Sequence, residues 1–219
     1  MEESDWSSDV CSSDLPERFN HAMMPAGFVA GSDDGVFLDD HLIIIGYGIN
    51  GRNVSKAARM AGIPYVILEV NPDTVHTERK AGEPIFYGDA TQEAVLTHMG
   101  IARARVLVIA IPDVAATRMI TSTARNLSPK LHTIARTRFV SEVKPLYELG
   151  ADEVIPEEYE TSIEIFARVL RFYGLPRNVI LNLIDQVRGD QYGMLRHMRT
   201  KEDVSQVHLD LVKQIEIET

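Results

Sequence analysis

The stretch that decides the fold of this chain is LIIIGYGING, residues 42–51. Its four consecutive branched apolar residues predict a short strand that is buried on both faces. Three glycines follow at positions 46, 48 and 51, and a helical pattern runs from them through Ala61 to Gly62. A buried strand, a glycine-rich turn and a helix in this order are typical of the first unit of a dinucleotide-binding fold.

The same alternation of strand and helix continues along the chain. Further strands are predicted at residues 65–70, 84–87, 106–110, 131–135 and 153–155. The helices between them are predicted at residues 72–81, 91–99, 114–126 and 140–149. Alternation of this kind implies parallel strands joined by right-handed crossovers. We therefore expect an α/β, Rossmann-like doubly wound sheet in the order 3-2-1-4-5-6 over residues 41–156.

The segments outside this domain have different characters. Residues 1–15 resemble a translated sequencing adapter and are set aside as an artefact, the alternative being a genuine acidic, serine-rich leader. Residues 16–40 are predicted to be a linker. Residues 157–200 are predicted to form amphipathic helices, at 159–173 and 176–188, whose apolar stripes would serve dimerisation and output. Residues 201–219 read as the start of a segment that is cut short.

Composition excludes several classes of function. The formal net charge of −10 disfavours nucleic acid and anionic membrane surfaces as partners. No window approaches 18 uncharged apolar residues, so no transmembrane span is predicted. The single cysteine lies within residues 1–15, and the seven histidines are scattered without metal-ligand spacing. Metal sites and covalent catalysis are therefore not expected.

The glycine-rich turn is the central candidate for chemistry. Gly46 would allow the tight strand-to-helix turn, Gly48 would let the backbone approach a pyrophosphate, and Gly51 would permit close packing of helix on strand. The helix beginning at Ile49 and Asn50 would then present unpaired N–H groups and a positive dipole end to the phosphates. The alternative is a tight turn that binds no ligand.

Glu69 ends the second predicted strand about twenty residues after the turn. A carboxylate at this position accepts hydrogen bonds from both ribose hydroxyls and repels a 2′-phosphate, which favours NAD or a simple adenosine ligand over NADP. The alternative is that Glu69 is a solvated strand end. Its neighbours Val70 and Asn71 would line the same part of the site.

Two other strand ends are predicted to complete the site. Asp89, followed by Ala90 and Thr91, would lie at the adenosine end, where its carboxylate would accept from the adenine amino group, cap the next helix, or do both. Across the switch point, the small apolar run Ala110-Ile111-Pro112 would let a ring or a ribose lie against the backbone. Asp113 after this run has an N-cap as its alternative role.

Basic side chains near the turn are candidates for neutralising phosphate charge. Arg52 lies just inside the first helix, and Arg136 and Arg138 follow the fifth predicted strand. A guanidinium binds phosphate oxygens bidentately. Arg52 or Arg136 would play this role, whereas for Arg138 an ordinary ion pair is at least as good an interpretation. Tyr47, within the glycine turn, is included in the predicted site by position.

Residues 41 to about 156 resemble the N-terminal, nucleotide-binding half of an RCK domain (the Trk-type NAD-binding module), in the variety attached to Kef-type cation:proton antiporters. The resemblance covers over half of the chain. It is carried by six segments: LIIIGYGINGR at 42–52, VILEVNP at 66–72, FYGDAT at 86–91, VLVIAIPD at 106–113, IAR at 134–136 and GADEVIP at 150–156.

This resemblance implies a domain on the cytoplasmic side of the inner membrane that forms a homodimer or a higher RCK assembly. It implies control of a membrane-embedded cation transporter domain by a bound nucleotide, NAD or NADH first, with AMP, ADP or ATP as alternatives. By resemblance, the three glycines would hold the phosphates, Glu69 the ribose and Asp89 the adenosine end.

Three classes of function remain open from the sequence. The leading hypothesis is a non-enzymatic sensor in which nucleotide binding shifts a dimer between two arrangements. The runner-up is an NAD-dependent oxidoreductase fragment, although only about sixty residues follow the sixth strand and they hold no assembled acid–base group. The third is a Rossmann-like interaction scaffold with no ligand.

Overall fold

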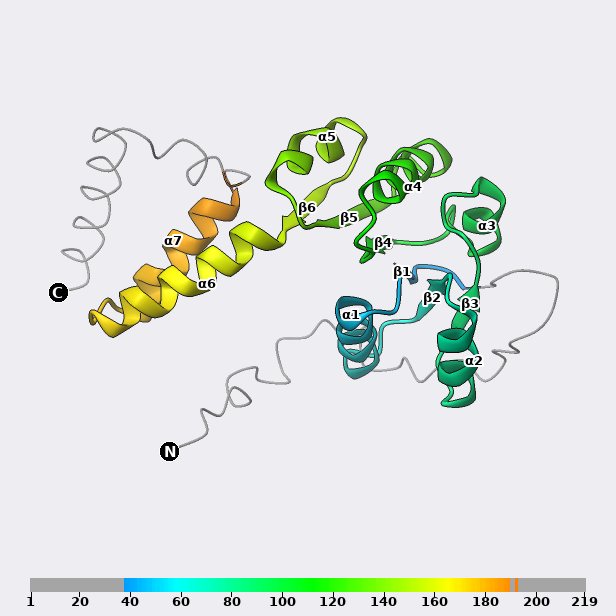
Figure 1. Ribbon diagram of the computed structural model, residues 1–219, viewed down its shortest axis with the longest axis horizontal. Helices are drawn as coiled ribbons and strands as arrows, with labels where there is room; N and C mark the ends of the chain where they lie inside the picture. The colour runs from blue at the N-terminus through cyan, green and yellow to red at the C-terminus, as the bar shows by residue number, and fades with distance from the viewer. Residues whose placement is uncertain (1–37, 190–191, 193–219) are drawn as a thin grey trace. The chain divides into compact units, whose positions relative to one another are not determined.

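A computed structural model describes residues 38–189 and residue 192 (Figure 1). The proposed artefact at 1–15, nearly all of the linker at 16–40 and the segment at 201–219 lie outside these residues. Within the described residues, no helix is long and apolar enough to cross a membrane. The chain divides into two compact units, of which the first holds the sheet up to Arg136 together with Glu142–Val154, and the second holds Thr137–Ser141 and the chain from Ile155 onward.

The six strands form one sheet in the order β3-β2-β1-β4-β5-β6, which confirms the predicted fold class and strand order. Every strand pairing whose register is known is parallel, as in the alignment of Ile43 with Val66 of β2 and Leu107 of β4. The strands are β1 Leu42–Ile45, β2 Tyr65–Glu69, β3 Ile85–Tyr87, β4 Val106–Ile109, β5 His132–Thr137 and β6 Glu153–Pro156.

The helices of the first unit follow the strands as expected, with small changes at their ends. They are α1 Ile49–Met60, α2 Pro72–Lys80, α3 Glu93–His98, α4 Val114–Leu127 and α5 Val143–Glu148. Two predicted boundaries were wrong. The helix predicted from Thr91 begins at Glu93, because Asp89 and Thr91 form a local turn before it. The helix predicted at 140–149 is a 3₁₀ turn, η2 Val140–Glu142, followed by α5.

Helices cover both faces of the sheet, as Figure 1 shows for α1 and α2 on one side and α3 and α4 on the other. Alternate residues of the buried strands supply the two cores, because successive side chains of a strand point to opposite faces. Ile43 and Ile45 belong to the core that contains Leu96 and Ile120 from α3 and α4. Their neighbours in β1 belong to the opposite core, which contains Ala58 of α1 and Val75 of α2. The continuous apolar run of β1 is thus explained by burial on both faces.

In the second unit, α6 Glu157–Phe172 and α7 Arg177–Gly189 form a helical hairpin. Ile163 of α6 and Val187 of α7 are buried in one cluster with Tyr192. The apolar stripes predicted for dimerisation therefore pack within the chain itself, since Val179, Ile180 and Leu183 are buried as well. The two stripes thus face each other within the hairpin, and their part in dimerisation stays a prediction.

Candidate nucleotide-binding site

The turn between β1 and α1 is held tightly by its glycines. Gly46 has a φ of +91°, a conformation that L side chains rarely adopt, and a methyl group there would lie 2.7 Å from Ile111. Gly51 lies against the same turn, where a methyl group would collide with the Gly46 carbonyl oxygen. Both glycines are thus required by the fold itself, in the roles that the sequence predicts for them.

Gly48 differs from these two glycines, because nothing lies within 4 Å of the position that its Cβ would occupy. Its φ is −71°, which any residue adopts, so the protein's own packing does not demand glycine here. Gly48 is the N-cap of α1, and among the described residues no side chain caps this helix. The first-turn N–H groups of a helix lack intrahelical partners and attract anions. The space and the donors suit a phosphate that approaches the backbone.

Tyr47 lies inside this turn, and its side chain is buried in the core cluster that contains Ala58 of α1 and Val75 of α2. Burial raises the pKa of the Tyr47 hydroxyl. Arg52 packs over the Tyr47 ring, donates from Nε to the Tyr47 carbonyl at 3.2 Å, and pairs with Glu78 of α2 at 2.9 Å. The guanidinium predicted to meet a phosphate is therefore engaged by α2, and its role at a phosphate stays a prediction.

Glu69, at the end of β2, reaches directly into the glycine turn. Its Oε2 accepts from the Tyr47 backbone N–H at 2.7 Å. Its Oε1 accepts from the N–H groups of Val70 and Asn71, both at 2.9 Å. Asn71 in turn caps α2, where its side-chain oxygen accepts from the backbone N–H groups of Asp73 and Thr74. The structure therefore places the predicted ribose acceptor beside the predicted phosphate turn.

Asp89 follows β3, whose end is tied to β2 by the bond from the Gly88 N–H to the Glu69 carbonyl at 3.1 Å. The Asp89 carboxylate accepts from the backbone N–H and the hydroxyl of Thr91, and these bonds lower its pKa. Ala90 between them is buried. Asp89 is not the N-cap of α3, which begins two residues after Thr91 with Gln92 as its cap. Its contact with adenine stays a prediction.

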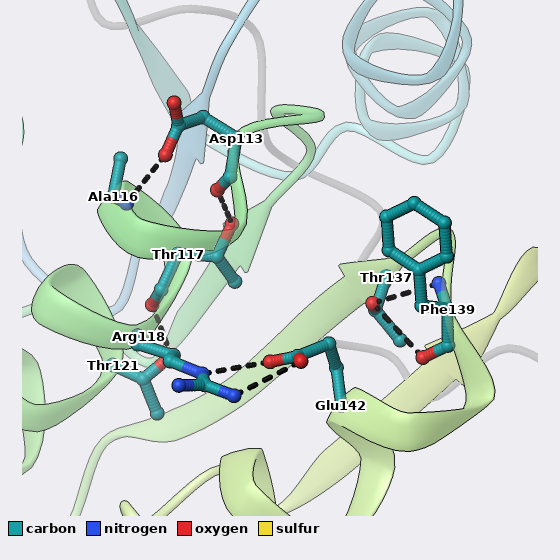
Figure 2. A network of polar contacts seen from close by, with 8 residues as sticks. All are labelled: Asp113, Ala116, Thr117, Arg118, Thr121, Thr137, Phe139 and Glu142. Atoms are coloured by element: carbon teal, nitrogen blue, oxygen red, sulfur yellow. Dashed lines mark hydrogen bonds and ion pairs between the residues drawn. The ribbon is translucent and has the colours of Figure 1, made fainter.

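The end of β4 lies against the same turn. The Ala110 N–H donates to the Ile45 carbonyl at 2.9 Å, and the Ile111 side chain faces Gly46. After Pro112, Asp113 caps α4 by accepting from the Ala116 N–H at 2.7 Å (Figure 2), which agrees with the N-cap alternative.

Below this cap on α4, Arg118 forms a bidentate pair with Glu142 (Figure 2). This pair holds the start of α5 against α4 and had no counterpart in the predicted site. Arg136 lies half-buried in β5, one residue after Ala135, which aligns with Ile109 of β4. Arg138 stacks on the neighbouring Phe139 ring, with 5.9 Å between its guanidinium carbon and the ring centre.

The structure thus brings together the glycine turn, Glu69 with Val70 and Asn71, and the Ala110-Ile111 segment, while Arg52 is directed to α2. In residues 38–189 and 192, no group of three His, Cys, Asp or Glu side chains is placed to hold a metal ion. The sequence missed Glu78 as the partner of Arg52, because the two residues lie on different helices with no local signal. Together, sheet order and turn define a domain of the Rossmann-like, doubly wound class.

The chain belongs to the TrkA-N domain family, whose model matches residues 42–157. This finding confirms the family resemblance of the sequence. A putative K(+) efflux antiporter KefB from Alkalimonas amylolytica is 35% identical over 159 residues, covering 73% of this chain and 24% of the relative. The chloroplastic K(+) efflux antiporter 1 of Arabidopsis thaliana is 32% identical over 151 residues, covering 69% of this chain and 13% of the relative. The chain thus spans about a quarter or less of these relatives.

Solved structures show the same fold. The TrkA-N domain of the inner membrane protein ybaL from Escherichia coli superposes with a TM-score of 0.58 at 27% identity, covering 60% of this chain and 97% of that domain. A Shewanella denitrificans Kef CTD in AMP-bound form superposes with a TM-score of 0.59 at 24% identity, covering 71% of this chain and 94% of that chain. The GsuK channel bound to NAD superposes with a TM-score of 0.53 at 23% identity, covering 61% of this chain and 23% of that chain. Because the Kef CTD and the GsuK channel are less than 25% identical to this chain, their likeness shows the fold alone.

Proposed function

We propose that this chain is a regulatory domain that binds an adenine nucleotide and thereby controls a transporter or channel for potassium or another monovalent cation. The observation that carries the proposal is the glycine turn itself. Gly48 leaves open space at the uncapped start of α1, and the adjoining turn is held by the Glu69 carboxylate. This arrangement suits a diphosphate or phosphate with a ribose beside it.

The ligand is proposed to be NAD or NADH, with AMP, ADP and ATP as alternatives. Neighbours of the same fold bind such ligands: one GsuK structure holds NAD, another holds ADP, and the Kef CTD holds AMP. The charge of Glu69 argues against NADP, because a 2′-phosphate would lie against a carboxylate.

The proposed partner is a membrane-embedded cation transporter domain, with this chain on its cytoplasmic side. The relatives named above are K(+) efflux antiporters, and the part of them that matches this chain is a quarter or less of their length. Control requires that the nucleotide bind two arrangements of the assembly with different affinity, since equal affinity would shift no population.

The assembly is proposed to be a homodimer or a larger RCK-type array formed through α6. This helix carries an apolar stripe, Ile165, Val169 and Phe172, on the face opposite to the one that packs on α7. Residues at spacings of four and three share one side of a helix. Exposed apolar surface of this kind marks a protein interface in many proteins.

Calorimetric titration of the purified chain with NAD, NADH, AMP, ADP, ATP and NADP tests the proposal. We expect saturable binding of at least one adenosine ligand and weaker binding of NADP. Gly48→Ala places a methyl group in the open space of the turn, so it should weaken binding by at least about tenfold, or about 1.4 kcal/mol. Absence of heat with all six ligands would overturn the proposal.

The domain is proposed to act without catalysis. A dehydrogenase needs an acid or base beside the nicotinamide, supplied in many cases by a separate substrate domain. Incubation with NAD and a panel of alcohols and hydroxy acids checks this point by absorbance at the NADH band. Specific turnover that is lost in Gly48→Ala would contradict a purely regulatory role.

A further inference from the structure

The acceptor positions of Glu69 are nearly all used by the protein itself. An ionised carboxylate offers about four lone-pair positions on its two oxygens. In the described part of the chain, three backbone N–H groups already donate to it: Tyr47 to Oε2, and Val70 and Asn71 to Oε1. One position therefore remains on Oε2, whereas the 2′- and 3′-hydroxyls of a ribose present two donors.

We propose that Glu69 is a positioning residue for the glycine turn and that recognition of both ribose hydroxyls releases one N–H of the segment that begins α2. The first half of this inference concerns the protein without ligand. The second half rests on the proposed nucleotide binding. Ribose recognition would then be linked directly to the start of α2.

The positioning role follows from how the Tyr47 peptide groups are held. Its N–H donates to Glu69 at the end of β2, and its carbonyl accepts from Arg52 of α1. Charged partners form stronger hydrogen bonds than neutral ones. The turn is thereby fixed on both sides in the conformation that leaves Gly48 open, before any phosphate arrives. The Tyr47 N–H is also withheld from the phosphate, which leaves the first-turn N–H groups of α1 as the donors.

The link to α2 follows from the partners of Oε1. The Asn71 N–H donates to Glu69, and the Asn71 side chain caps α2 by accepting from the backbone N–H groups of Asp73 and Thr74. Release of the Asn71 or Val70 N–H would loosen the segment that caps the start of this helix. The same helix carries Glu78, the partner of Arg52. Both groups that hold Tyr47 therefore connect to α2, and this makes α2 the element that responds to the ribose.

Residue-resolved amide hydrogen exchange of the chain without ligand tests the positioning role. Glu69→Ala removes all three acceptor contacts, so the Tyr47 amide should exchange at least about tenfold faster than in the wild type. Glu69→Gln keeps a single acceptor oxygen, so either Tyr47 or the Val70–Asn71 pair should lose protection. Glu148→Gln, an exposed glutamate of α5, is the matched control and should leave these amides unchanged. Unchanged exchange at Tyr47 in Glu69→Ala would overturn the positioning role.

Saturation with AMP and with 2′,3′-dideoxy-AMP tests the link to α2 without any substitution. With AMP, the Val70 or Asn71 amide should lose protection while Tyr47 stays protected. With the dideoxy compound, both amides should stay as in the free protein. Equal exchange at Val70 and Asn71 with the two bound ligands would overturn the link while leaving nucleotide binding intact. If neither compound nor any other adenosine ligand binds, the proposed function falls, and the link falls with it.

Discussion

Gly48 and Gly51 stand three residues apart at the start of α1, yet an added methyl group meets opposite surroundings at the two positions. At Gly51 it would collide with the Gly46 carbonyl oxygen, whereas at Gly48 nothing lies within 4 Å. We expect Gly51→Ala to lower the free energy of unfolding by about 3 kcal/mol. Gly48→Ala should change it by less than about 1 kcal/mol. Urea unfolding followed by circular dichroism measures both, and equal losses in the two variants would contradict the packing described for Gly51.

His41, directly before β1, predicts a pH dependence of stability. Its imidazole is completely buried and its Nε2 lies 3.1 Å from the Met99 carbonyl. Burial lowers the pKa of His41, and nearby Arg103 lowers it further, while the Met99 bond and Asp39 oppose the shift. The unfolded chain then binds a proton at His41 at higher pH than the folded chain does. Stability from this group is therefore complete above about pH 6.5 and is lost as the pH falls below it.

The measurement is the urea midpoint at pH 7.5 and 5.5 in the wild type and in His41→Gln, whose amide retains a donor for Met99. The wild type should lose more stability on acidification than the variant. Asp89 and Glu160 do not titrate between pH 7.5 and 5.5, because the pKa of each carboxyl is lowered. Identical pH profiles for the two proteins would show that His41 titrates as in the unfolded chain.

At the level of single residues, the sequence predicts which side chains gather at the turn but not which groups of the protein they bond to. Spacing after the glycines places Glu69 correctly, because the carboxyl ends of neighbouring parallel strands meet at one edge. Its three N–H partners depend on backbone geometry that no motif encodes. Arg52 shows the converse case. Arg52 and Glu78 are 26 residues apart in the sequence. They pair because α1 and α2 lie on the same face of the sheet.

Among the helices and strands, the guanidinium of Arg125 connects α4 to three points of the first unit that lie between its helices and strands. Arg125 of α4 donates to the Gly150 carbonyl after α5, to the Pro129 carbonyl, and to Asp152 before β6. Arg125→Ala leaves these acceptors without their donor and should cost about 2–4 kcal/mol. Arg105→Ala, which removes only an exposed pair with Asp40, should cost less than about 0.5 kcal/mol. Urea unfolding compares them, and losses of equal size would contradict the role assigned to Arg125.

Element types and their order were predictable because the hydrophobic pattern is read over many residues at once. β1 is the clearest example, since its four apolar residues divide between two cores in alternation. Boundaries were less predictable where a side chain competes with the backbone. Asp89 bonds to Thr91 and delays α3 by two residues relative to the prediction. Such local bonds are an alternative to helix formation, and a propensity pattern does not resolve the competition.

For the molecule as a whole, the sequence predicts a sheet domain at 41–156 followed by amphipathic helices. The compact units divide the chain at other points, because Thr137–Ser141 and the chain from Ile155 onward belong to the second unit. What the pattern did not reveal is that α6 is apolar on two opposite faces. The apolar periodicity of the sequence indicates the stronger face, which contains Ile163 and Phe166 and packs on α7. The second face, with Ile165, Val169 and Phe172, is evident only once the first is known to be occupied.

This second face of α6 predicts self-association of the chain. Phe172 is 91% exposed and Ile165 is 59% exposed, so the fold of the single chain gains little from either side chain. Covering such residues in a partner is worth about 1.5–3 kcal/mol for each fully buried side chain. The wild type is therefore expected to sediment as a dimer or larger species at micromolar concentration.

The decisive variant replaces both Ile165 and Val169 by Glu, which places two charges in the proposed interface. The dissociation constant should rise at least about thirtyfold, equivalent to about 2 kcal/mol, while the unfolding midpoint of the monomer stays the same. Met60→Glu is the matched control, because Met60 is equally apolar and 89% exposed but lies on α1 of the other unit. Since Ile165, Val169 and Met60 are 59%, 48% and 89% exposed in the single chain, a change in sedimentation confined to the α6 variant indicates lost contacts between copies. A wild type that remains monomeric, or an α6 variant that associates as the wild type does, would show that this face does not join two copies of the chain.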